Sequence, residues 1–401
     1  MALTLLSGKI SFNNMLFKTV VIQAFRFCHV QKYYIVISRA IYTIYIVKNI
    51  ILIMKTNRIL WIDWLKSLAI FGVIGIHVSS SLLTPDYLFS IQWYQGVVAA
   101  SVFRFGIILF LMASGFLILR KKQSIHDVPR RVKRVLVPFV FWLVLYAIIK
   151  VVFKHELGPS WAFGDLIGFI IRGFLDPTII SVQFWYVYMI LGLYILSPII
   201  SGWIQNAPIE EIKYYIWIWI IISCLQFIGV NSILFDYLMY FTGAIGYFIL
   251  GYYLAIQKNE LFKNRTFGAI LFILGSSITI IGTIGLSLMT HGQSLSFIRL
   301  GDLTPGAFLQ GIGLFIIVSN TDFTKVDRRI NEIAVKISKM SYGMYLSNIL
   351  IINFLDKFNL LYLNGITLIN IFIYIILILI LSAVIIKIMD MLPVLHLFSG
   401  D

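Results

Sequence analysis

The chain has 401 residues, of which 60% are hydrophobic and 12% are charged, whereas a soluble domain usually carries about 25% charged residues. A soluble fold could not bury so much apolar surface, so the composition excludes an ordinary soluble enzyme and predicts an all-α, polytopic integral membrane bundle. The net charge of +15 does not indicate nucleic-acid binding, because Lys and Arg cluster in alternate short loops. We therefore expect the lipid bilayer, and no nucleic acid, as a partner.

The first 53 residues fit this pattern poorly. Their second half is apolar enough for a helix, yet it contains Arg39 and Lys48, which a lipid-facing helix tolerates badly. Met54 precedes a basic stretch and a strong apolar span, as at the start of a membrane protein with a cytoplasmic N-terminus. We interpret 1–53 as a doubtful extension, a start-site artefact, and 54–401 as the membrane domain. The alternative is a genuine extra helix.

Apolar segments near the roughly 20 residues that cross a bilayer recur along the rest of the chain. Each must be helical, because only a helix satisfies its own backbone hydrogen bonds in lipid. We expect about ten transmembrane helices, at 64–83, 96–119, 134–153, 184–203, 214–230, 235–256, 268–289, 304–320, 339–356 and 365–391.

The distribution of Lys and Arg predicts which loops are cytoplasmic. The segment 120–134 holds seven Lys or Arg residues, whereas Asp86 is the one charged residue between the first and second spans. The positive-inside rule therefore places 120–134 in the cytoplasm. The longest loop, 154–183, then lies outside, and 163–174 is expected to form a short interfacial helix within it.

Ionisable side chains inside a span are costly in lipid and are therefore candidate functional residues. In the first span, Lys66 and His77 are eleven residues apart, which places both on one helix face, and Asp63 lies one turn before Lys66. Arg104 in the second span reaches about the depth of His77, because the two spans run in opposite directions. We interpret His77 and Arg104 as functional. Snorkelling or ion pairing at the inner helix end is an open alternative for Lys66 and Asp63.

Other polar or aromatic features have simpler explanations. Ser114 and Gly115 are small enough to let a neighbouring helix approach closely. The basic segment 120–134 is explained by topology, and binding of a phosphate-rich donor there is an additional hypothesis. The aromatic run 184–188 is typical of the belt at a membrane interface.

Five short patterns, in chain order between about Asn57 and Ile352, resemble the membrane acyltransferase-3 family, including its surface-polysaccharide O-acetyltransferase group. They are Asp63, Leu65, Lys66 and His77; Arg104, Phe105, Leu109, Phe110 and 114–118; Arg131, Arg134 and Pro138; 184–188 with Leu193, Tyr194, Ser197 and Pro198; and 341–346. Each pattern is weak alone, but five in order are fairly specific.

Three positions depart from the family pattern. The family usually has Arg at the position of Lys66, and Arg recognises phosphate through a planar, bidentate contact that Lys cannot make. Relatives often have His where this chain has Gln183 and Asn348. His77 is therefore the one family histidine that the chain keeps.

The resemblance implies transfer of an acyl group, typically acetyl from acetyl-coenzyme A on the cytoplasmic side, to a sugar hydroxyl of a glycan or lipid-linked sugar. Such polysaccharide O-acetylation would occur at the bacterial plasma membrane and modify the cell envelope. An imidazole is suited to removing the hydroxyl proton near neutral pH, so His77 is the expected catalytic base. Arg104 is expected to stabilise the oxyanion. An acyl-carrier role for His77 stays open.

The other motif residues are expected to bind donor or acceptor: Lys66, Asp63, Trp185, Tyr188, Tyr342 and Asn348. Acyl-coenzyme A is a co-substrate, and we expect no bound cofactor and no metal, because the two cysteines lack metal-ligand spacing. The competing function is an exporter or flippase of a polysaccharide or lipid-linked glycan. Transporters often show repeated halves and broken helices, and neither is clear in this sequence.

Overall fold

The computed structural model describes residues 59–154, 156–158, 160–227, 233–292, 304–358 and 368–400. The chain from Leu60 onward forms one unit. The interpretation of 1–53 as an extension lies outside the described residues and stays a prediction.

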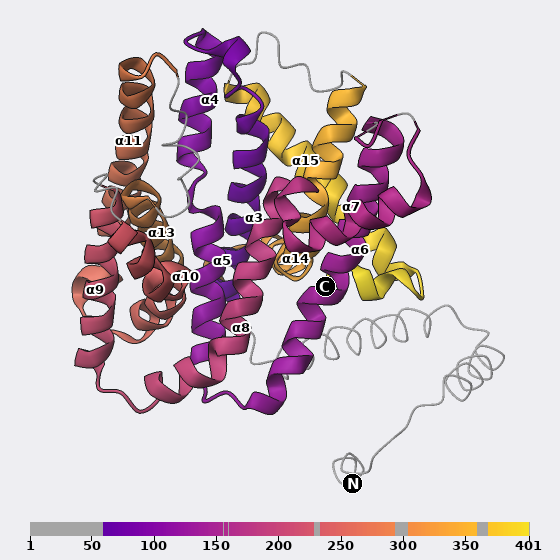
Figure 1. The fold of residues 1–401 in the computed structure, drawn as a ribbon. Coiled ribbons are helices and arrows are strands. Elements are labelled where there is room, and N and C mark those ends of the chain that lie inside the picture. Colours follow the sequence, from indigo (N-terminus) through magenta and orange to yellow (C-terminus); the bar gives the residue numbers. More distant parts are fainter. Residues whose placement is uncertain are drawn as a thin grey trace, which may run out of the picture. The chain divides into compact units, whose positions relative to one another are not determined.

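Helices dominate the described part of the chain, and no strand occurs in it (Figure 1). The α-helices are α3 (Leu60–Ser80), α4 (Ile91–Val102), α5 (Phe105–Leu119), α6 (Val128–Lys154), α7 (Phe163–Leu175), α8 (Trp185–Ile204), α9 (Ile209–Phe227), α10 (Ile233–Ile256), α11 (Arg265–Met289), α13 (Pro305–Ser319), α14 (Arg328–Lys357) and α15 (Leu368–Met391). A short 3₁₀ helix, η8 (Leu395–Phe398), follows α15.

Among the described residues, six helical segments are long and apolar enough to cross a membrane, and two shorter helices, Gly243–Ile256 and Pro305–Ser319, are also apolar. The six segments are Leu60–Ser80, Ile91–Leu119, Ile125–Phe153, Val182–Ile204, Arg265–Met289 and Leu368–Met391. The all-helical, multi-pass membrane architecture is thereby confirmed. All ten expected spans overlap helices, but length and composition support six, and the number ten stays a prediction.

Polar residues in the loops fix where several helices begin. Ser90, Asn264 and Asp327 each accept a hydrogen bond from a backbone amide in the first turn of α4, α11 and α14. Such caps satisfy amides that have no partner inside the helix. The apolar spans are therefore separated by short polar connections.

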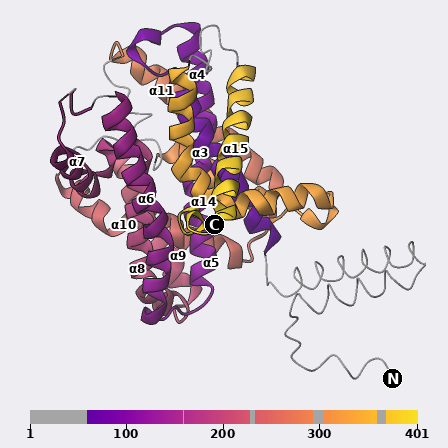
Figure 2. The same ribbon diagram turned by 90° about the vertical axis from the view of Figure 1, so that its right-hand side faces the viewer.

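Helix α3 lies among several others, with α5, α14, α4 and α15 packed against it (Figures 1 and 2). Its side chains Leu65, Ala69, Ile70 and Ile74 are fully buried. This explains how Lys66 and His77 on the same helix avoid lipid: they lie at a helix–helix contact rather than on the outside of the bundle.

The expected span 96–119 is not one continuous helix. It is interrupted between α4 and α5 at Phe103 and Arg104, where the Arg104 amide bonds back to Ser101 in a tight turn. The carbonyl of Ser101 also accepts a hydrogen bond from the Gln310 side chain of α13, 2.8 Å away. The turn changes the direction in which Arg104 leaves the backbone, and it places this side chain in the interior, where it is 6% exposed.

The segment expected to form a short interfacial helix is helical, as α7. Leu166, Phe169 and Gly173 are buried, whereas Phe163, Ile171 and the other apolar residues at four-residue spacing are exposed. Its apolar residues therefore occupy two faces, one packed on the bundle and one open, as expected for a helix at a membrane surface.

Candidate active site

Two groups of polar side chains lie on α3, one near each end. Lys66 and His77 are separated by eleven residues, or about 16 Å along the helix axis. Helix α14 runs beside α3 in the same direction, because Ser338 bonds to Asp63 and, further along both helices, Asn348 bonds to His77. We call this contact the α3–α14 seam, and both polar groups belong to it.

The group near the C-terminal end of α3 centres on His77. Its Nδ1 atom lies 2.6 Å from Oδ1 of Asn348. Asn348 is fully buried and His77 is partly exposed. Arg104 is close enough for its guanidinium charge to act on the imidazole. The structure thus places His77 and Arg104 together, as the opposite directions of the first two spans predicted.

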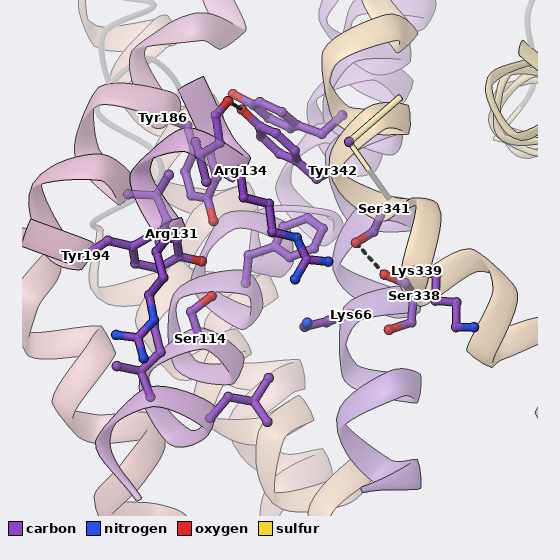
Figure 3. Close-up of a pocket in the computed structure, with 17 residues that line it drawn as sticks. Lys66, Ser114, Arg131, Arg134, Tyr186, Tyr194, Ser338, Lys339, Ser341 and Tyr342 are labelled. Atoms are coloured by element: carbon purple, nitrogen blue, oxygen red, sulfur yellow. Dashed lines mark hydrogen bonds between the residues drawn. The ribbon is translucent and has the colours of Figure 1, made fainter. Parts of the chain in front are cut away.

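The group near the N-terminal end of α3, which includes Lys66, lies at a cavity of about 300 Å³ (Figure 3). Its walls come from α3, α5, α6, α8 and α14, and Gly400 of the C-terminal segment completes them. The lining residues are Lys66, Phe110, Ser114, Leu117, Ile118, Arg131, Arg134, Val135, Tyr186, Ile190, Tyr194, Ser338, Lys339, Ser341, Tyr342, Tyr345 and Gly400.

The cavity is lined by positive charge. Lys66, Arg131, Arg134 and Lys339 contribute four cations, and none of the described lining residues is acidic. In Figure 3 the tips of Lys66 and Arg134 point into the cavity, whereas Lys339 points away from it. A concave surface with four cations attracts anions strongly. The cavity is therefore suited to a phosphate-bearing ligand.

Hydrogen bonds hold Arg131 at the cavity wall. Its guanidinium donates to the Gln123 side chain and to the Ser197 hydroxyl, 3.3 Å away. Gln123 in turn donates to the Ile118 carbonyl at 2.5 Å, and its backbone amide bonds to Ser201 at 2.8 Å. The basic loop between α5 and α6 is therefore fixed against α8, and Arg131 is preorganised.

An aromatic wall faces these cations and consists of Tyr186, Tyr194, Tyr342 and Tyr345. The Tyr342 hydroxyl donates to the Val135 carbonyl at 2.8 Å, and the Tyr345 hydroxyl donates to the Gln183 carbonyl. The Tyr342 and Tyr345 rings are nearly parallel, with centroids 6.5 Å apart. Flat aromatic faces of this kind can stack on a nucleotide base.

Four residues expected to bind donor or acceptor do not line the cavity: Asp63, Trp185, Tyr188 and Asn348, the last of which bonds to His77. Asp63 accepts a hydrogen bond from Ser338 at 2.7 Å, so it joins α3 to α14. Tyr188 is 39% exposed and donates to the Phe174 carbonyl at 2.6 Å. Trp185, at the start of α8, is partly exposed. For Trp185 and Tyr188 these positions favour the interfacial belt that was the simpler explanation.

A family model of acyltransferase domains, acyltransferase-3, matches residues 59–387. The match covers most of the chain and includes the whole α3–α14 seam. This chain belongs to the acyltransferase-3 family. Comparison with curated proteins and with solved structures gave no match. The protein is thus an acyltransferase, as the five sequence patterns predicted.

Sequence reasoning did not select several cavity residues of this acyltransferase. Ser114 was expected to help two helices approach, yet it lines the cavity, whereas Gly115 does allow close packing, because a Cβ there would meet the Phe248 carbonyl oxygen at 1.8 Å. Arg131 and Arg134 belong to one of the five family patterns, but their charge was explained first by topology, with donor binding as an additional hypothesis. Their three-residue spacing, which puts both on one face of a helix, was the available signal.

A stripe on α14 connects the cavity with His77. Ser338, Tyr342 and Tyr345 line the cavity, and Asn348, three residues further on, bonds to the imidazole. Residues three or four positions apart share a helix face, so these four side chains follow one line along the α3–α14 seam. The acyltransferase therefore has a cavity lined by cationic residues and a partly exposed histidine on the same seam.

Proposed function

We propose that this acyltransferase moves an acetyl group from a coenzyme A thioester to a hydroxyl of a cell-envelope glycan, at the bacterial plasma membrane. The observation that carries the proposal is the α3–α14 seam, with a cationic cavity at one level and the His77 group about 16 Å further along α3. The cavity accounts for a phosphate-bearing donor, and the imidazole accounts for the chemistry.

The chemistry of the cavity matches the charged part of coenzyme A. Arg guanidinium groups bind phosphate through paired hydrogen bonds, and Lys adds a point charge. The tyrosine wall provides faces on which an adenine base can stack. Because the segment 120–134, which includes Arg131 and Arg134, is the most basic of the chain, the positive-inside rule puts the cavity on the cytoplasmic side, where coenzyme A thioesters are made.

In the base mechanism, the acceptor hydroxyl gives its proton to His77 while its oxygen attacks the thioester carbonyl carbon. A tetrahedral oxyanion forms beside Arg104, whose positive charge stabilises it. The carbon–sulfur bond then breaks, and the leaving thiolate takes the proton from the imidazolium. In the carrier mechanism, His77 attacks the thioester first and passes the acetyl group to the hydroxyl in a second step.

The test uses the full-length protein in vesicles with radiolabelled acetyl-coenzyme A and a cell-wall glycan fraction. We expect label in the glycan when the donor is on the side of the basic loop, and none with donor on the other side alone. Absence of label from either side, with folded protein, would contradict acyl transfer to a glycan.

A pair of variants tests the donor cavity within the same assay. Arg134→Ala removes a cavity cation, and the KM for acetyl-coenzyme A should rise roughly tenfold, the value of one charge-assisted hydrogen bond. Arg130→Ala is the matched control, since Arg130 also belongs to α6 but is exposed and does not line the cavity. Equal donor KM values for the two variants would place the donor elsewhere.

Glycan export is the second candidate, and one feature favours it. Transporters often have helices broken inside the membrane, and here α4 is separated from α5 at Phe103, while Gly243 interrupts α10 with φ 21° and ψ −141°. The vesicle assay separates the two functions. Glycan that crosses the vesicle membrane without acquiring label would establish export instead of acyl transfer.

A further inference from the structure

The orientation of the Asn348 amide is fixed by its own helix. Its Nδ2 group donates to the carbonyls of Met344 and Tyr345, at 3.1 Å and 2.6 Å. The opposite amide orientation would direct Oδ1 against two carbonyl oxygens, which cannot donate a hydrogen bond. The Nδ2 group therefore faces α14, and Oδ1 faces His77.

This orientation decides which nitrogen of His77 carries the proton. Oδ1 of Asn348 is purely an acceptor, so the Nδ1 atom 2.6 Å away must present an N–H. A neutral imidazole has one N–H, and its other nitrogen then holds a free electron pair. The electron pair that can react is therefore on Nε2.

We infer that Asn348 is a positioning residue, which holds His77 in its Nδ1–H tautomer and presents Nε2 as the reacting atom. The inference rests on the proposed acyl transfer at His77 and adds the atom that performs it. Orienting groups of this kind accompany catalytic histidines in unrelated hydrolases, where an Asp or Asn binds the nitrogen that does not react.

Neighbouring side chains make Asn348 a rigid support. The Tyr146 hydroxyl of α6 donates to the Leu346 carbonyl at 3.0 Å and accepts from the Leu350 amide at 2.7 Å. Leu346 and Leu350 are one helix turn apart, so the Tyr146 hydroxyl contacts the turn of α14 that carries Asn348 on both sides of it. Gln183 donates to the same hydroxyl at 3.3 Å. The helix turn that carries Asn348 is thus anchored from α6 and from the segment just before α8.

The assignment of Nε2 is compatible with both mechanisms. As a base, Nε2 takes the hydroxyl proton, and the resulting imidazolium keeps its Nδ1–H bonded to Asn348. As a carrier, Nε2 forms the bond to the acetyl carbon while the carbon–sulfur bond breaks, and Nδ1–H again stays on Asn348. Arg104, from the α4–α5 turn, is a charged group near the ring.

Kinetics with three variants test the role. Asn348→Leu removes the acceptor at similar volume, and kcat should fall roughly 10–100-fold with the donor KM unchanged. Asn348→Asp keeps an acceptor for Nδ1–H, so it should retain more activity than Asn348→Leu, and its carboxylate should move the acidic limb of the pH–rate profile to higher pH. Ser347→Ala, at an equally buried neighbouring position, should match the wild type in kcat and in pH profile.

A spectroscopic measurement tests the tautomer without any substitution of Asn348. In protein labelled with nitrogen-15 histidine, the signal lost in His77→Ala identifies His77 among the six histidines. It should show a protonated Nδ1 and an unprotonated Nε2 in the neutral ring. A protonated Nε2 would overturn the inference even if acyl transfer is established.

The kinetic results also distinguish this inference from the proposed function. Normal activity of His77→Ala would refute the catalytic assignment of His77 itself. If His77→Ala is inactive but Asn348→Leu keeps the kcat and the pH profile of the wild type, the positioning role alone is refuted.

Discussion

Two helix contacts of this acyltransferase use polar and small residues in opposite ways. Along the α3–α14 seam, side chains bond from one helix to the other, as in Trp64 to Asn331 and Ser338 to Asp63. Between α11 and α13, backbones meet directly. A Cβ on Gly275 would lie 2.4 Å from the Gly306 carbonyl oxygen, and one on Gly313 would be 2.5 Å from another backbone oxygen.

The polar side chains of the two contacts also differ in the groups to which they bond. On α11, Thr279 bonds to the Gly275 carbonyl of its own helix, and the one amide that crosses from α13, Gln310, reaches the neutral Ser276. Along the α3–α14 seam two of the crossing bonds, from Ser338 to Asp63 and between Asn348 and His77, involve ionisable groups. Polarity inside a span is thus not enough to indicate a catalytic site. An ionisable group that bonds to another helix is the more informative signal.

The largest effect should come from the centre of the α3–α14 seam. His77→Ala removes the imidazole, and acyl transfer should fall by roughly 10³–10⁴-fold, the contribution of a positioned base. Label incorporation into glycan measures it. His126→Ala is the matched control, because His126 lies exposed in the loop before α6. Wild-type labelling by folded His77→Ala would make the α3–α14 seam structural, like the α11–α13 contact.

The next effect concerns Arg104. Arg104→Ala should lower kcat by about 10²–10³-fold if the guanidinium stabilises the oxyanion. Arg104→Lys, which keeps a positive charge, should recover part of the loss. The measurement is kcat at saturating donor concentration. An unchanged kcat with a raised KM would instead assign Arg104 to substrate binding.

The α11–α13 contact should respond in stability rather than in catalysis. Gly275→Ala forces a methyl group against backbone atoms that cannot move aside, and it should lower the free energy of unfolding by about 1–3 kcal/mol. Gly285→Ala is the control on the same helix, because nothing lies within 4 Å of a Cβ there. Unfolding in detergent measures the stability of the two variants, and kcat of the folded fraction measures their catalysis. A kcat loss in folded Gly275→Ala would show that the two contacts are not separable.

Part of this structure could be predicted from the sequence. The apolar spans, the helix at α7 and the proximity of His77 and Arg104 follow from hydrophobic length and from helix geometry. The bond between His77 and Asn348 joins residues 271 positions apart, and no local periodicity reveals which of the helices will pack together. The break at Phe103 carries no proline, so nothing in the local sequence predicted it. Five helices contribute residues to the cavity. Several of these residues belong to the sequence motifs, but the sequence did not show that they lie next to one another.

The smallest effect is expected at Lys66, where the α3–α14 seam meets the cavity. Relatives usually have Arg at this position, and a guanidinium keeps the positive charge while adding planar, bidentate phosphate recognition. The cavity of about 300 Å³ leaves space for the larger group. Lys66→Arg should therefore keep kcat within about twofold of the wild type, as expected for a substitution that removes no contact. The donor KM should stay equal or decrease.

The matched variant Lys66→Met has a similar length but no charge, and it separates two roles of this residue. If Lys66 binds the donor, Lys66→Met should raise the donor KM while Lys66→Arg does not, and high salt should reduce the difference, because screening weakens charge–phosphate attraction. If Lys66 instead only extends toward the membrane surface, both variants should show the wild-type KM. In that case donor binding in the cavity would depend on Arg131 and Arg134.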